Sequence, residues 1–526
     1  MTTATRDDAM IEVPRRQFDA LQSTAKTLGA EVEQLRAQLD WLKRQVFGPK
    51  SEKRPAEADA LQATLFERQA VPGQVPQKSV TVPEYQRRKH RTGDEVNDTG
   101  LRFGSEVPVR EIVLRCAELD GPDADQYEVI DHKVSLRLAR RPGAHVVLKY
   151  LRPVVRRKDD GVMATVPAPV GVLDHAQVDV SFLAGMIVDK FVYHLPIYRQ
   201  HQRLADEGIT VARSTIEQWV KRGIELLYPV VKAISSRILS GGHIKMDETA
   251  IRAGRTKNEK TGRGKMSQGW LWPVLGEDGD IMFGYSGGRG LAEVKKFIGE
   301  KYAGTIQTDG YGVYAKYAAK APQCIHALCW SHTRRAFLKA EASEPQAVAE
   351  VLEMIRALYG IEKRLRKDAA DAESIVATRK AESAPIVDRI FQWINDRIGD
   401  PSLVPTSPLA KALGYAKERE KGLRVFLADA WLDLDTNDLE RALRVIPMGR
   451  KNWLFCTSEA GAEQVAAIQT ILATCRAHDV DPYTYLVDVL QRINEHPAGR
   501  VVELTPKLWR ERFGQNPLRS DLDRCQ

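Results

Sequence analysis

The chain has 526 residues, of which 43% are hydrophobic, so it is long enough for roughly two to four domains with substantial cores. Its 78 basic and 70 acidic residues give a formal net charge of +8, which favours an anionic partner. Six cysteines occur without CxxC spacing, which indicates reduced thiols in a cytosolic protein. The N-terminal residues lack the apolar segment of a secretory signal, and no apolar run approaches the roughly 20 residues of a membrane span. We therefore expect a cytoplasmic protein without membrane contact.

Residues 15–47 carry an apolar heptad repeat. Leucines recur every seven residues, and a second apolar side chain stands three residues before each of them. Over roughly four heptads this pattern predicts a leucine-zipper coiled coil, and hence at least a dimer. The alternative is one amphipathic helix that packs on the body of its own chain. The predicted dimerisation residues are Leu21, Leu28, Leu35 and Leu42.

Two regions of different composition follow. Residues 48–105 are rich in Pro, Gln, Glu and Ala, which is typical of a linker. Their basic cluster at residues 87–91 is either a solvated part of the tether or a contact to DNA phosphates. In residues 106–170, Val, Ile, Leu and Arg alternate between turn signals, which predicts a small β-rich module of short strands.

Residues 178–238 have the periodicity of helices and contain a helix-turn-helix pattern. One helix is predicted over residues 197–206 and ends before Gly208. A second helix is predicted to begin at Ser214, which forms a capping box with Glu217. This second helix either lies in a DNA major groove or only packs as part of a helical hairpin. The side chains placed to contact DNA are Arg213, Thr215, Gln218 and Lys221.

The remaining chain begins with residues 240–335, which alternate strands with turns. Three meander strands followed by strands that enter helices predict an α/β sheet with an antiparallel side. Residues 336–435 are predicted to be helical, and residues 436–490 open with a helix whose N-cap is Asn437. Residues 491–526 are expected to form a C-terminal tail.

Three acidic residues stand at strand ends or at a helix start. Asp247 follows a short apolar run in which Lys245 faces the same side, and Asp309 follows an apolar strand before a Gly-Tyr-Gly turn. Glu440 lies in the first turn of the helix near Asn437. Carboxylates can hold a pair of Mg²⁺ ions that stabilise the attacking and leaving oxygens of a phosphoryl displacement. With 70 acidic residues, however, the spacing alone fits unrelated solvated carboxylates as well.

The chain resembles the large transposase of the IS66 insertion-sequence family. The similarity covers most of the chain and includes, in order, LDWLKRQVFGPKSEK, DKFVYHLPIYRQ, EGITVARSTIEQWV, MDET, TDGYGVY, CWSHTRRAF, ERALRVIPMGRKNWLF and DPYTYLVDVL. The resemblance implies a DDE transposase whose ribonuclease-H-like catalytic core spans residues 240–335 and 436–490 around a helical insertion. It implies that Asp247, Asp309 and Glu440 are the catalytic acids and hold two Mg²⁺ ions.

Several basic residues near these acids are candidates for contact with DNA. In CWSHTRRAF, Cys329 and His332 are only two ligands, which do not make a zinc site. His332 and the arginines after it either touch DNA phosphates or are a structural histidine and a solvated pair. The basic pair in MGRKNWLF, Arg450 and Lys451, likewise either contacts DNA phosphates or is solvated surface. The predicted DNA contacts here are Arg334, Arg335, Arg441, Arg444, Arg450 and Lys451.

One region departs from the pattern of the family. Relatives carry two CxxC pairs before the helix-turn-helix, which suggests a zinc-binding module. Here only Cys116 remains, and the second place reads RPVVRRKDDG without a cysteine. We therefore predict no zinc. The β-rich module either folds through its strands alone and binds DNA differently, or has lost that function in this chain.

The resemblance implies an enzyme that cuts the ends of its element and joins them to target DNA. Its partners would be double-stranded DNA, as terminal inverted repeats and as target, a second copy of the chain, and small accessory proteins of the element. The expected location is the bacterial cytoplasm, associated with the nucleoid. The alternative is a non-catalytic DNA-binding protein, either an inactive transposase or a regulator.

Overall fold

In the computed structural model, the described residues run from 102 to 524, with gaps at 106, 115–118, 120–123, 142–143, 160–162, 175, 258–263 and 454–455. The predicted coiled coil of residues 15–47 with its four leucines, most of the linker and Cys116 lie outside the described residues. No helix among those described is long and apolar enough to cross a membrane.

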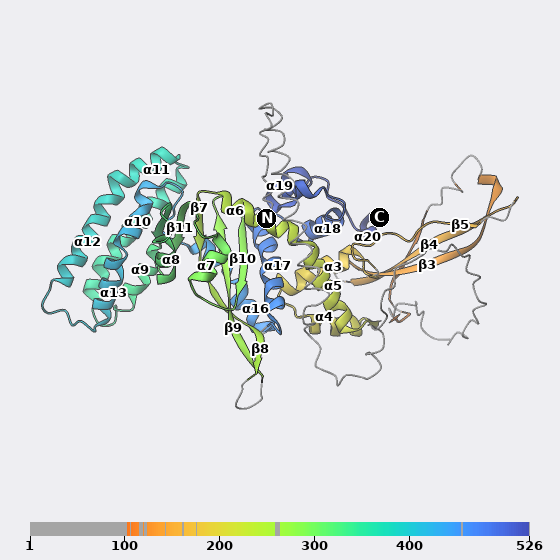
Figure 1. The fold of residues 1–526 in the computed structure, drawn as a ribbon, viewed down its shortest axis with the longest axis horizontal. Coiled ribbons are helices and arrows are strands. Elements are labelled where there is room, and N and C mark those ends of the chain that lie inside the picture. The colour runs from red at the N-terminus through yellow and green to blue at the C-terminus, as the bar shows by residue number, and fades with distance from the viewer. Residues whose placement is uncertain are drawn as a thin grey trace, which may run out of the picture. The chain divides into compact units, whose positions relative to one another are not determined.

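A mixed six-stranded sheet forms the centre of the described chain (Figure 1). The strand order is β10-β9-β7-β11-β12, and β8 also pairs with β9. β7, β8 and β10 are antiparallel to β9, whereas β11 is parallel to both β7 and β12. The sheet therefore has the antiparallel side that the sequence predicts. The strands are β7 (His243–Met246), β8 (Thr249–Lys257), β9 (Gly264–Gly276), β10 (Ile281–Ser286), β11 (Gly304–Thr308) and β12 (Cys324–Leu328).

The strand pairing is interrupted where the first predicted acid stands. β7 and β8 pair with successive parts of β9, with Met246 opposite Val274 and Thr249 opposite Leu271. Between these pairs lies Pro273 of β9, which has no N–H to donate to a ladder. Asp247 and the residue after it fall in this interruption, so their side chains stand at a break in the sheet.

Helices cover the edge strand β10. α17 (Glu459–Ala477) packs along β10 and is buried over most of its length. The hydroxyl of Thr470 accepts a hydrogen bond from the N–H of Phe283 at 2.8 Å, and that of Thr474 accepts one from the N–H of Ile281 at 3.1 Å. These bonds satisfy an edge that would otherwise present free backbone donors. α6 (Tyr228–Ser240) packs against β9 and β10. In the sequence, α7 (Leu291–Ile298) connects β10 to β11, and α8 (Gly312–Ala318) connects β11 to β12.

Residues 336–435 are helical and have a hydrophobic cluster that includes Val351, Ile355 and Phe391. A buried ion pair between Arg379 and Glu362, with a distance of 2.7 Å, lies within these helices. Arg379 also donates to backbone carbonyls near the end of the insertion. The elements are α9 (Trp330–Leu338), which enters the insertion, α10 (Pro345–Lys367), α11 (Ala372–Thr378), a π-helical turn (Arg379–Ser383), α12 (Ala384–Ile398), α13 (Pro408–Glu418) and α14 (Glu420–Leu423).

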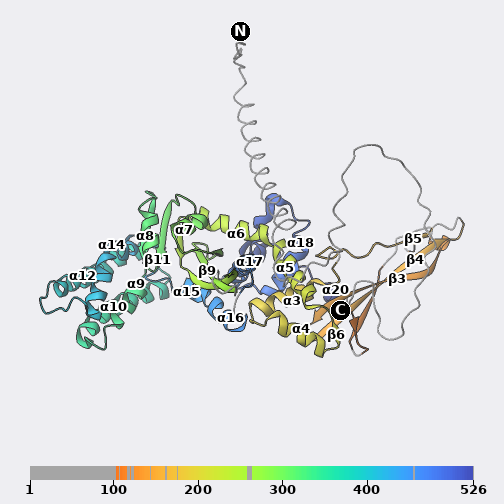
Figure 2. The same ribbon diagram turned by 60° about the horizontal axis from the view of Figure 1, so that its bottom comes forward.

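The chain then returns to the sheet through α15 (Asn437–Leu443) and α16 (Val445–Trp453). α15 lies beside β9 (Figure 2). Thr436, not Asn437, is the N-cap of α15, and its side chain makes no capping bond. The carboxylate of Asp435 instead accepts hydrogen bonds from the backbone and the side-chain amide of Asn437.

The helix-turn-helix region contains α3 (Val180–Phe191), α4 (Ile197–Asp206), β6 (Ile209–Thr210) and α5 (Arg213–Leu226). The bounds of α4 match the prediction. The predicted capping box is wrong, because α5 begins one residue earlier with Ala212 as N-cap and without a side-chain cap. The turn between the helices also holds β6, which pairs with β1 (Arg102–Phe103), and the sequence did not indicate this pair.

A four-stranded sheet precedes these helices and receives the C-terminal residues. Residues 491–526 are not a simple tail, because Leu522 is buried beside Tyr150 and the Tyr150 hydroxyl donates to Asp521 at 2.8 Å. The strands are β2 (Val109–Val113), β3 (Tyr127–Arg141), β4 (Ala144–Arg157) and β5 (Met163–Thr165), and the C-terminal helices are α18 (Pro482–Arg492), α19 (Pro506–Arg512) and α20 (Asp521–Arg524).

Candidate active site

Two of the predicted acids end neighbouring parallel strands. β7 and β11 pair with Lys245 opposite Gln307. Asp247 directly follows β7, and Asp309 directly follows β11. Continuing the register by two residues brings Asp309 opposite Asp247. Because the carboxyl ends of parallel strands share one edge of a sheet, the fold brings these two carboxylates together.

Asp247 has a perturbed pKa. Its Oδ1 atom accepts a hydrogen bond from the backbone N–H of Glu248 at 2.7 Å. Burial, together with the negative charges of Glu248 and Asp309, raises the pKa of Asp247 to about 7. A carboxyl group that titrates near neutral pH beside a second acid is a common feature of functional sites.

Glu248 uses its carboxylate for structural contacts. The Arg289 Nε atom donates to Oε1 of Glu248 at 2.8 Å, and the Tyr314 hydroxyl donates to Oε2. Arg289 in turn stacks over the ring of Tyr311, 4.1 Å from its centroid. Both oxygens of Glu248 therefore have protein partners, which fits a neighbour of the site better than a metal ligand.

Asp309 is held by its own turn and by the insertion. Gly310 has a φ of 94°, a conformation that favours glycine, and it turns the chain directly after the acid. The Oδ1 atom of Asp309 accepts a hydrogen bond from the N–H of Tyr311 at 2.8 Å. Its carbonyl oxygen accepts one from the hydroxyl of Tyr415 on α13, also at 2.8 Å. A helix of the insertion thus contacts the backbone of the second acid.

The third predicted acid, Glu440, faces α9. The Arg335 guanidinium donates to both of its carboxylate oxygens, at 2.6 and 2.9 Å. The Nε2 atom of His332 lies 3.7 Å from the same carboxylate. Burial lowers the pKa of Arg335, but the bond and charge of Glu440 and the charge of Asp247 raise it above its ordinary value. Arg335 therefore lies in the electrostatic field of two of the predicted acids.

The donor atoms fit a divalent ion in one part of the site only. Asp247 and Asp309 repel each other when both are ionised, and a hard cation bound to carboxylate oxygens relieves this repulsion. Glu440 directs both oxygens to Arg335 instead. In the part of the chain that the structure describes, no group of three or more His, Cys, Asp or Glu side chains is placed to hold a metal ion. Glu440 would have to exchange Arg335 for an ion.

Cys329 and His332 lie beside the acids at the start of α9. The N–H of Cys329 donates to the carbonyl of Thr308, the residue before Asp309, at 3.1 Å. Burial alone would raise the pKa of the Cys329 thiol, but His332 lowers it below its ordinary value. Burial lowers the pKa of His332, yet Cys329 and Asp309 raise it above its ordinary value. His332 therefore accepts a proton more readily than a free histidine.

The residues predicted to contact DNA from the helix-turn-helix lie on α5, away from these hydrogen-bonded groups. Arg213 and Gln218 are exposed, whereas Thr215 and Lys221 are half-buried. Arg213 and Lys221 each pair with a glutamate one turn further along the helix, at 3.2 and 3.9 Å. These pairs lower the free positive charge at the start of α5.

The other predicted DNA contacts divide into structural and free side chains. Arg335 binds Glu440, as described above. Arg450 is half-buried and donates to the backbone carbonyl of Ala250, which ties α16 to β8. The exposed side chains without a carboxylate partner among the described residues are Arg334, Arg441, Arg444 and Lys451.

Lys245 is a part of the site whose role the sequence did not reveal. Strand alternation puts it on the same side as Asp247, and a strand end of this kind is often solvated. Lys245 is instead only 2% exposed, and its Nζ atom donates to Asp433 and Asp438 at 2.7 Å each. The acidic run DLDTND at residues 433–438 was the signal that could have indicated a buried cation.

Three regions of the chain match sequence models of known families. Residues 175–464 match the Transposase IS66 family, and residues 470–506 match the IS66 C-terminal element. Residues 34–96 match the Transposase C of IS166 homeodomain. The last match indicates a homeodomain-like N-terminal region, and it overlaps most of the stretch that composition predicts to be a linker.

Similar proteins occur in Sinorhizobium fredii (strain NBRC 101917 / NGR234). The chain is 31% identical to the uncharacterized protein y4qI over 76% of this chain and 74% of that protein. It is 29% identical to the uncharacterized protein y4hP over 72% of this chain and 70% of that protein. Among solved structures, the Drosophila P element transposase strand transfer complex aligns with 64% of this chain and 89% of that chain. Its TM-score of 0.20 and identity of 11% carry no argument about the fold.

Proposed function

Because the chain belongs to the IS66 transposase family, we propose that it is a DDE transposase that cuts the ends of its element and joins them to target DNA. The observation that carries this proposal is the pair of acids at the ends of two parallel strands. Asp247 and Asp309 are neighbours in the register, and the pKa of Asp247 is raised to about 7. Such a pair is suited to a hard divalent cation.

We infer that residues 240–335 and 436–490 form a ribonuclease-H-like catalytic core. β8 continues β7 beyond the interruption and is not counted separately here. The strand order then supports this inference, since the first strand, β7, lies between the second, β9, and the fourth, β11. The first three strands are antiparallel, and the fourth and fifth are parallel to the first. One acid follows the first strand, one follows the fourth, and one lies on a helix after the insertion.

Asp247, Asp309 and Glu440 would hold two Mg²⁺ ions through their carboxylate oxygens. When bound, the ions would lower the pKa of the attacking water and neutralise charge on the phosphate. Arg335 adds positive charge at the same place, where it donates to Glu440. In the first reaction a water oxygen bonds to phosphorus and the 3′ oxygen of the element leaves as a hydroxyl. In the second, this hydroxyl attacks a target phosphorus and a target 3′ oxygen leaves, so neither step needs a protein–DNA bond.

We also propose roles for the other parts of the chain. Residues 15–47 would pair two protomers, so that two element ends are held together. The β-rich module of residues 106–170 and α5 would bind the terminal inverted repeats. Small accessory proteins of the element would act with this assembly, which would work at the nucleoid.

The test is Mg²⁺-dependent nicking of a labelled duplex that carries the element end. We expect cleavage by the wild type in Mg²⁺, none in EDTA, and none by Asp247→Asn. Asp396→Asn, an exposed aspartate on α12 without an ion pair among the described residues, is the matched control and should cut normally. A wild-type protein that binds the end but never cuts it would favour the non-catalytic alternative. A protein that cuts without giving joined products would instead be a nuclease.

A further inference from the structure

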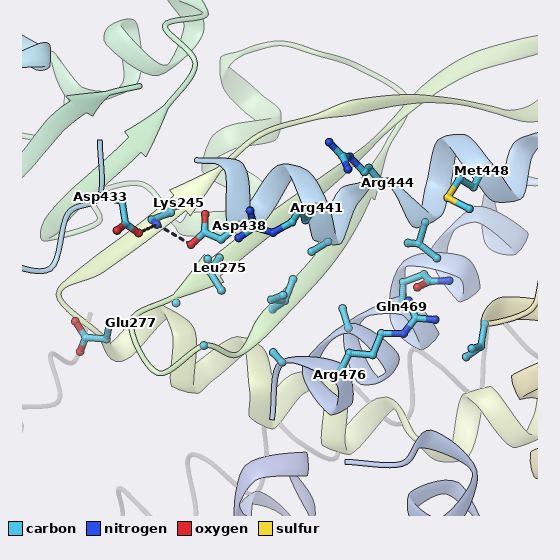
Figure 3. A pocket seen from close by; sticks show the side chains of 18 of the residues that line it. Lys245, Leu275, Glu277, Asp433, Asp438, Arg441, Arg444, Met448, Gln469 and Arg476 are labelled. Atoms are coloured by element: carbon cyan, nitrogen blue, oxygen red, sulfur yellow. Dashed lines mark hydrogen bonds and ion pairs between the residues drawn. The ribbon is translucent and has the colours of Figure 1, made fainter. Parts of the chain in front are cut away.

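A pocket of about 770 Å³ lies next to the proposed active site (Figure 3). It is bounded by β7, the turn between β9 and β10, α15, α16 and α17. Arg441, Arg444 and Arg476 are among the residues that line it, and Met448 and Leu275 provide apolar surface (Figure 3). Arg441 is adjacent in the chain to the predicted acid on α15, whose side chain faces α9 instead. α15 therefore carries both a predicted acid, Glu440, and a residue that lines the pocket, Arg441.

The acidic residues that line this pocket are already partnered. Asp433 and Asp438 bind Lys245, and Asp433 also pairs with Arg366 at 3.0 Å. Glu277 accepts a hydrogen bond from the backbone of residue 242 at 3.2 Å and lies 3.0 Å from a histidine ring. In contrast, no carboxylate among the described residues forms an ion pair with Arg441 of α15, with Arg444 between α15 and α16, or with Arg476 of α17. The pocket therefore has a surplus of positive charge.

A strained residue lies at the same pocket. His194 has a φ of 59°, which is uncommon for a residue other than glycine. Its buried Nδ1 atom has no hydrogen-bond partner among the described residues. Burial and the nearby charge of Arg476 lower the pKa of His194, so the ring stays neutral beside the arginine. Strain and an unsatisfied buried polar atom are both more frequent at functional sites than elsewhere.

We propose that Arg441, Arg444 and Arg476 form a phosphate-binding pocket for the DNA strand that continues from the proposed catalytic acids; this inference rests on the proposed function. Guanidinium groups bind phosphate oxygens through two parallel hydrogen bonds. Arg441 and Arg444 are three residues apart, hence about 4.5 Å along a helix axis. Arginine side chains are long enough to reach neighbouring phosphates of one strand from these two positions.

The position of these side chains favours a nucleic acid strand over a small anion. All three arginines are exposed, so they can contact successive phosphates along a surface without enclosing a single ion. Arg441 lies on α15 next to Glu440, and Arg444 lies between α15 and α16, so a strand whose reacting phosphate lies at Glu440 would have both arginines close to it. Arg476 on α17 would hold the opposite side of the same strand.

The experiment measures DNA binding by the full chain in EDTA, so that cleavage cannot affect the result. Labelled element-end duplex and labelled single strand are titrated at salt concentrations from roughly 50 to 200 mM. The test variant is Arg441→Gln, Arg444→Gln and Arg476→Gln combined. The control removes the same charge from exposed, unpaired residues of the insertion, as Lys363→Gln, Lys367→Gln and Arg389→Gln combined. Urea unfolding of each variant verifies its stability.

Affinity decreases with salt concentration, so the slope of log affinity against log salt concentration is negative. For duplex, we expect the magnitude of this slope to fall by about 2 to 3 in the test variant, since each lost phosphate contact removes about 0.9. The control should keep the wild-type slope. An unchanged slope in the test variant, or an equal fall in both variants, would overturn the proposal. A separate measurement uses inorganic phosphate as the probe. Thermal stabilisation by phosphate that only the test variant loses, with an unchanged DNA slope, would indicate a small-anion site and would also overturn it.

The outcome is separable from that of the proposed function. If the wild type never cuts DNA but the slope falls only in the test variant, the pocket is a DNA-binding site and the catalytic proposal fails. If the wild type cuts and joins DNA while the slope is unchanged, the catalytic proposal stands and the pocket assignment fails.

Discussion

Asp247 and Glu248 are adjacent in the chain, yet their carboxylates have different environments. Glu248 has an arginine and a tyrosine as direct partners. Among the described residues, Asp247 accepts a hydrogen bond from a backbone N–H alone, and its neighbours in the fold include the acid Asp309. Burial raises the pKa of both carboxyl groups, but loss of charge at Glu248 also leaves Arg289 without its ion-pair partner.

For Asp247→Asn we expect higher stability at alkaline pH without divalent ions. The pKa of Asp247 is raised to about 7, above its ordinary value of 3.8. Between these values the folded protein holds a proton that the unfolded chain releases, so stability falls as pH rises through 7. One pKa unit corresponds to about 1.4 kcal/mol, so the variant should gain roughly 2 to 4 kcal/mol at pH 8 and almost nothing at pH 4. Urea unfolding in EDTA at both pH values measures this, and equal stability at pH 8 would contradict it.

For Glu248→Gln we expect lower stability and retained cleavage of DNA. Burial raises the pKa of Glu248 and so favours its neutral form. The substitution nevertheless leaves Arg289 without its carboxylate partner and removes an oxygen that accepts from the Tyr314 hydroxyl, so the variant should lose roughly 1 to 3 kcal/mol of unfolding free energy. It should still cut DNA in Mg²⁺ at temperatures where it is folded, because the structure uses Glu248 for internal contacts. Urea unfolding and the nicking assay on the same preparation test both statements. Complete loss of cleavage by a folded Glu248→Gln protein would instead assign Glu248 to the metal site.

At the scale of elements, the meeting of the two aspartates depends on how closely β11 approaches β7. Gly304 begins β11 with a φ of 153°, and a Cβ atom there would lie 2.3 Å from the carbonyl oxygen of Gly242. Gly304→Ala should therefore lower the free energy of unfolding by about 2 to 4 kcal/mol. Gly360→Ala, in the middle of α10 with open space around it, should raise it by about 0.5 to 1 kcal/mol. Chemical denaturation of both variants measures the difference, and similar effects of the two substitutions would contradict this account of the strand contact.

Periodicity predicted those elements whose signal is local. α4 has the predicted bounds because its apolar spacing and the following Gly208, with a φ of 78°, both act within a few residues. The start of α5 was predicted wrongly, because the Ser214 pattern resembles a capping box while the helix begins at Arg213 without any side-chain cap. The packing of residues 491–526 was missed for another reason. It depends on Leu522 and Asp521 meeting β4, more than 370 residues away in the chain, which no local pattern records.

The sequence predicted the positions of some residues of the candidate site but not the contacts between them. Strand ends could place Asp247 and Asp309, since each directly follows an apolar run. Neither periodicity nor spacing could show that Glu440 binds Arg335 or that Lys245 is buried between two aspartates. Such contacts join residues from different elements and are set by tertiary packing alone.

At the scale of the whole described chain, Lys245 ties the sheet to the segment that returns from the insertion. Its charge is buried, whereas its partners Asp433 and Asp438 keep 37% and 35% of their side chains exposed. Removing both partners as Asp433→Asn with Asp438→Asn leaves a buried cation unpaired and should cost about 3 to 5 kcal/mol. Lys245→Met leaves two aspartates that water can reach, so it should cost less. Urea unfolding ranks the variants, and a greater loss in Lys245→Met would contradict this view of the contact.

The central claim is that Asp247, Asp309 and Glu440 act together in joining element ends to target DNA. The most direct measurement is strand transfer in vitro, with labelled element-end DNA, plasmid target, Mg²⁺ and the accessory proteins of the element. It compares the wild type with Asp247→Asn, Asp309→Asn, Glu440→Gln and the control Asp396→Asn. We predict that the wild type and the control join ends, and that the three variants bind the ends with wild-type affinity but join none. Joined products from any of the three variants, or a wild type that binds the ends and never joins them, would contradict the account.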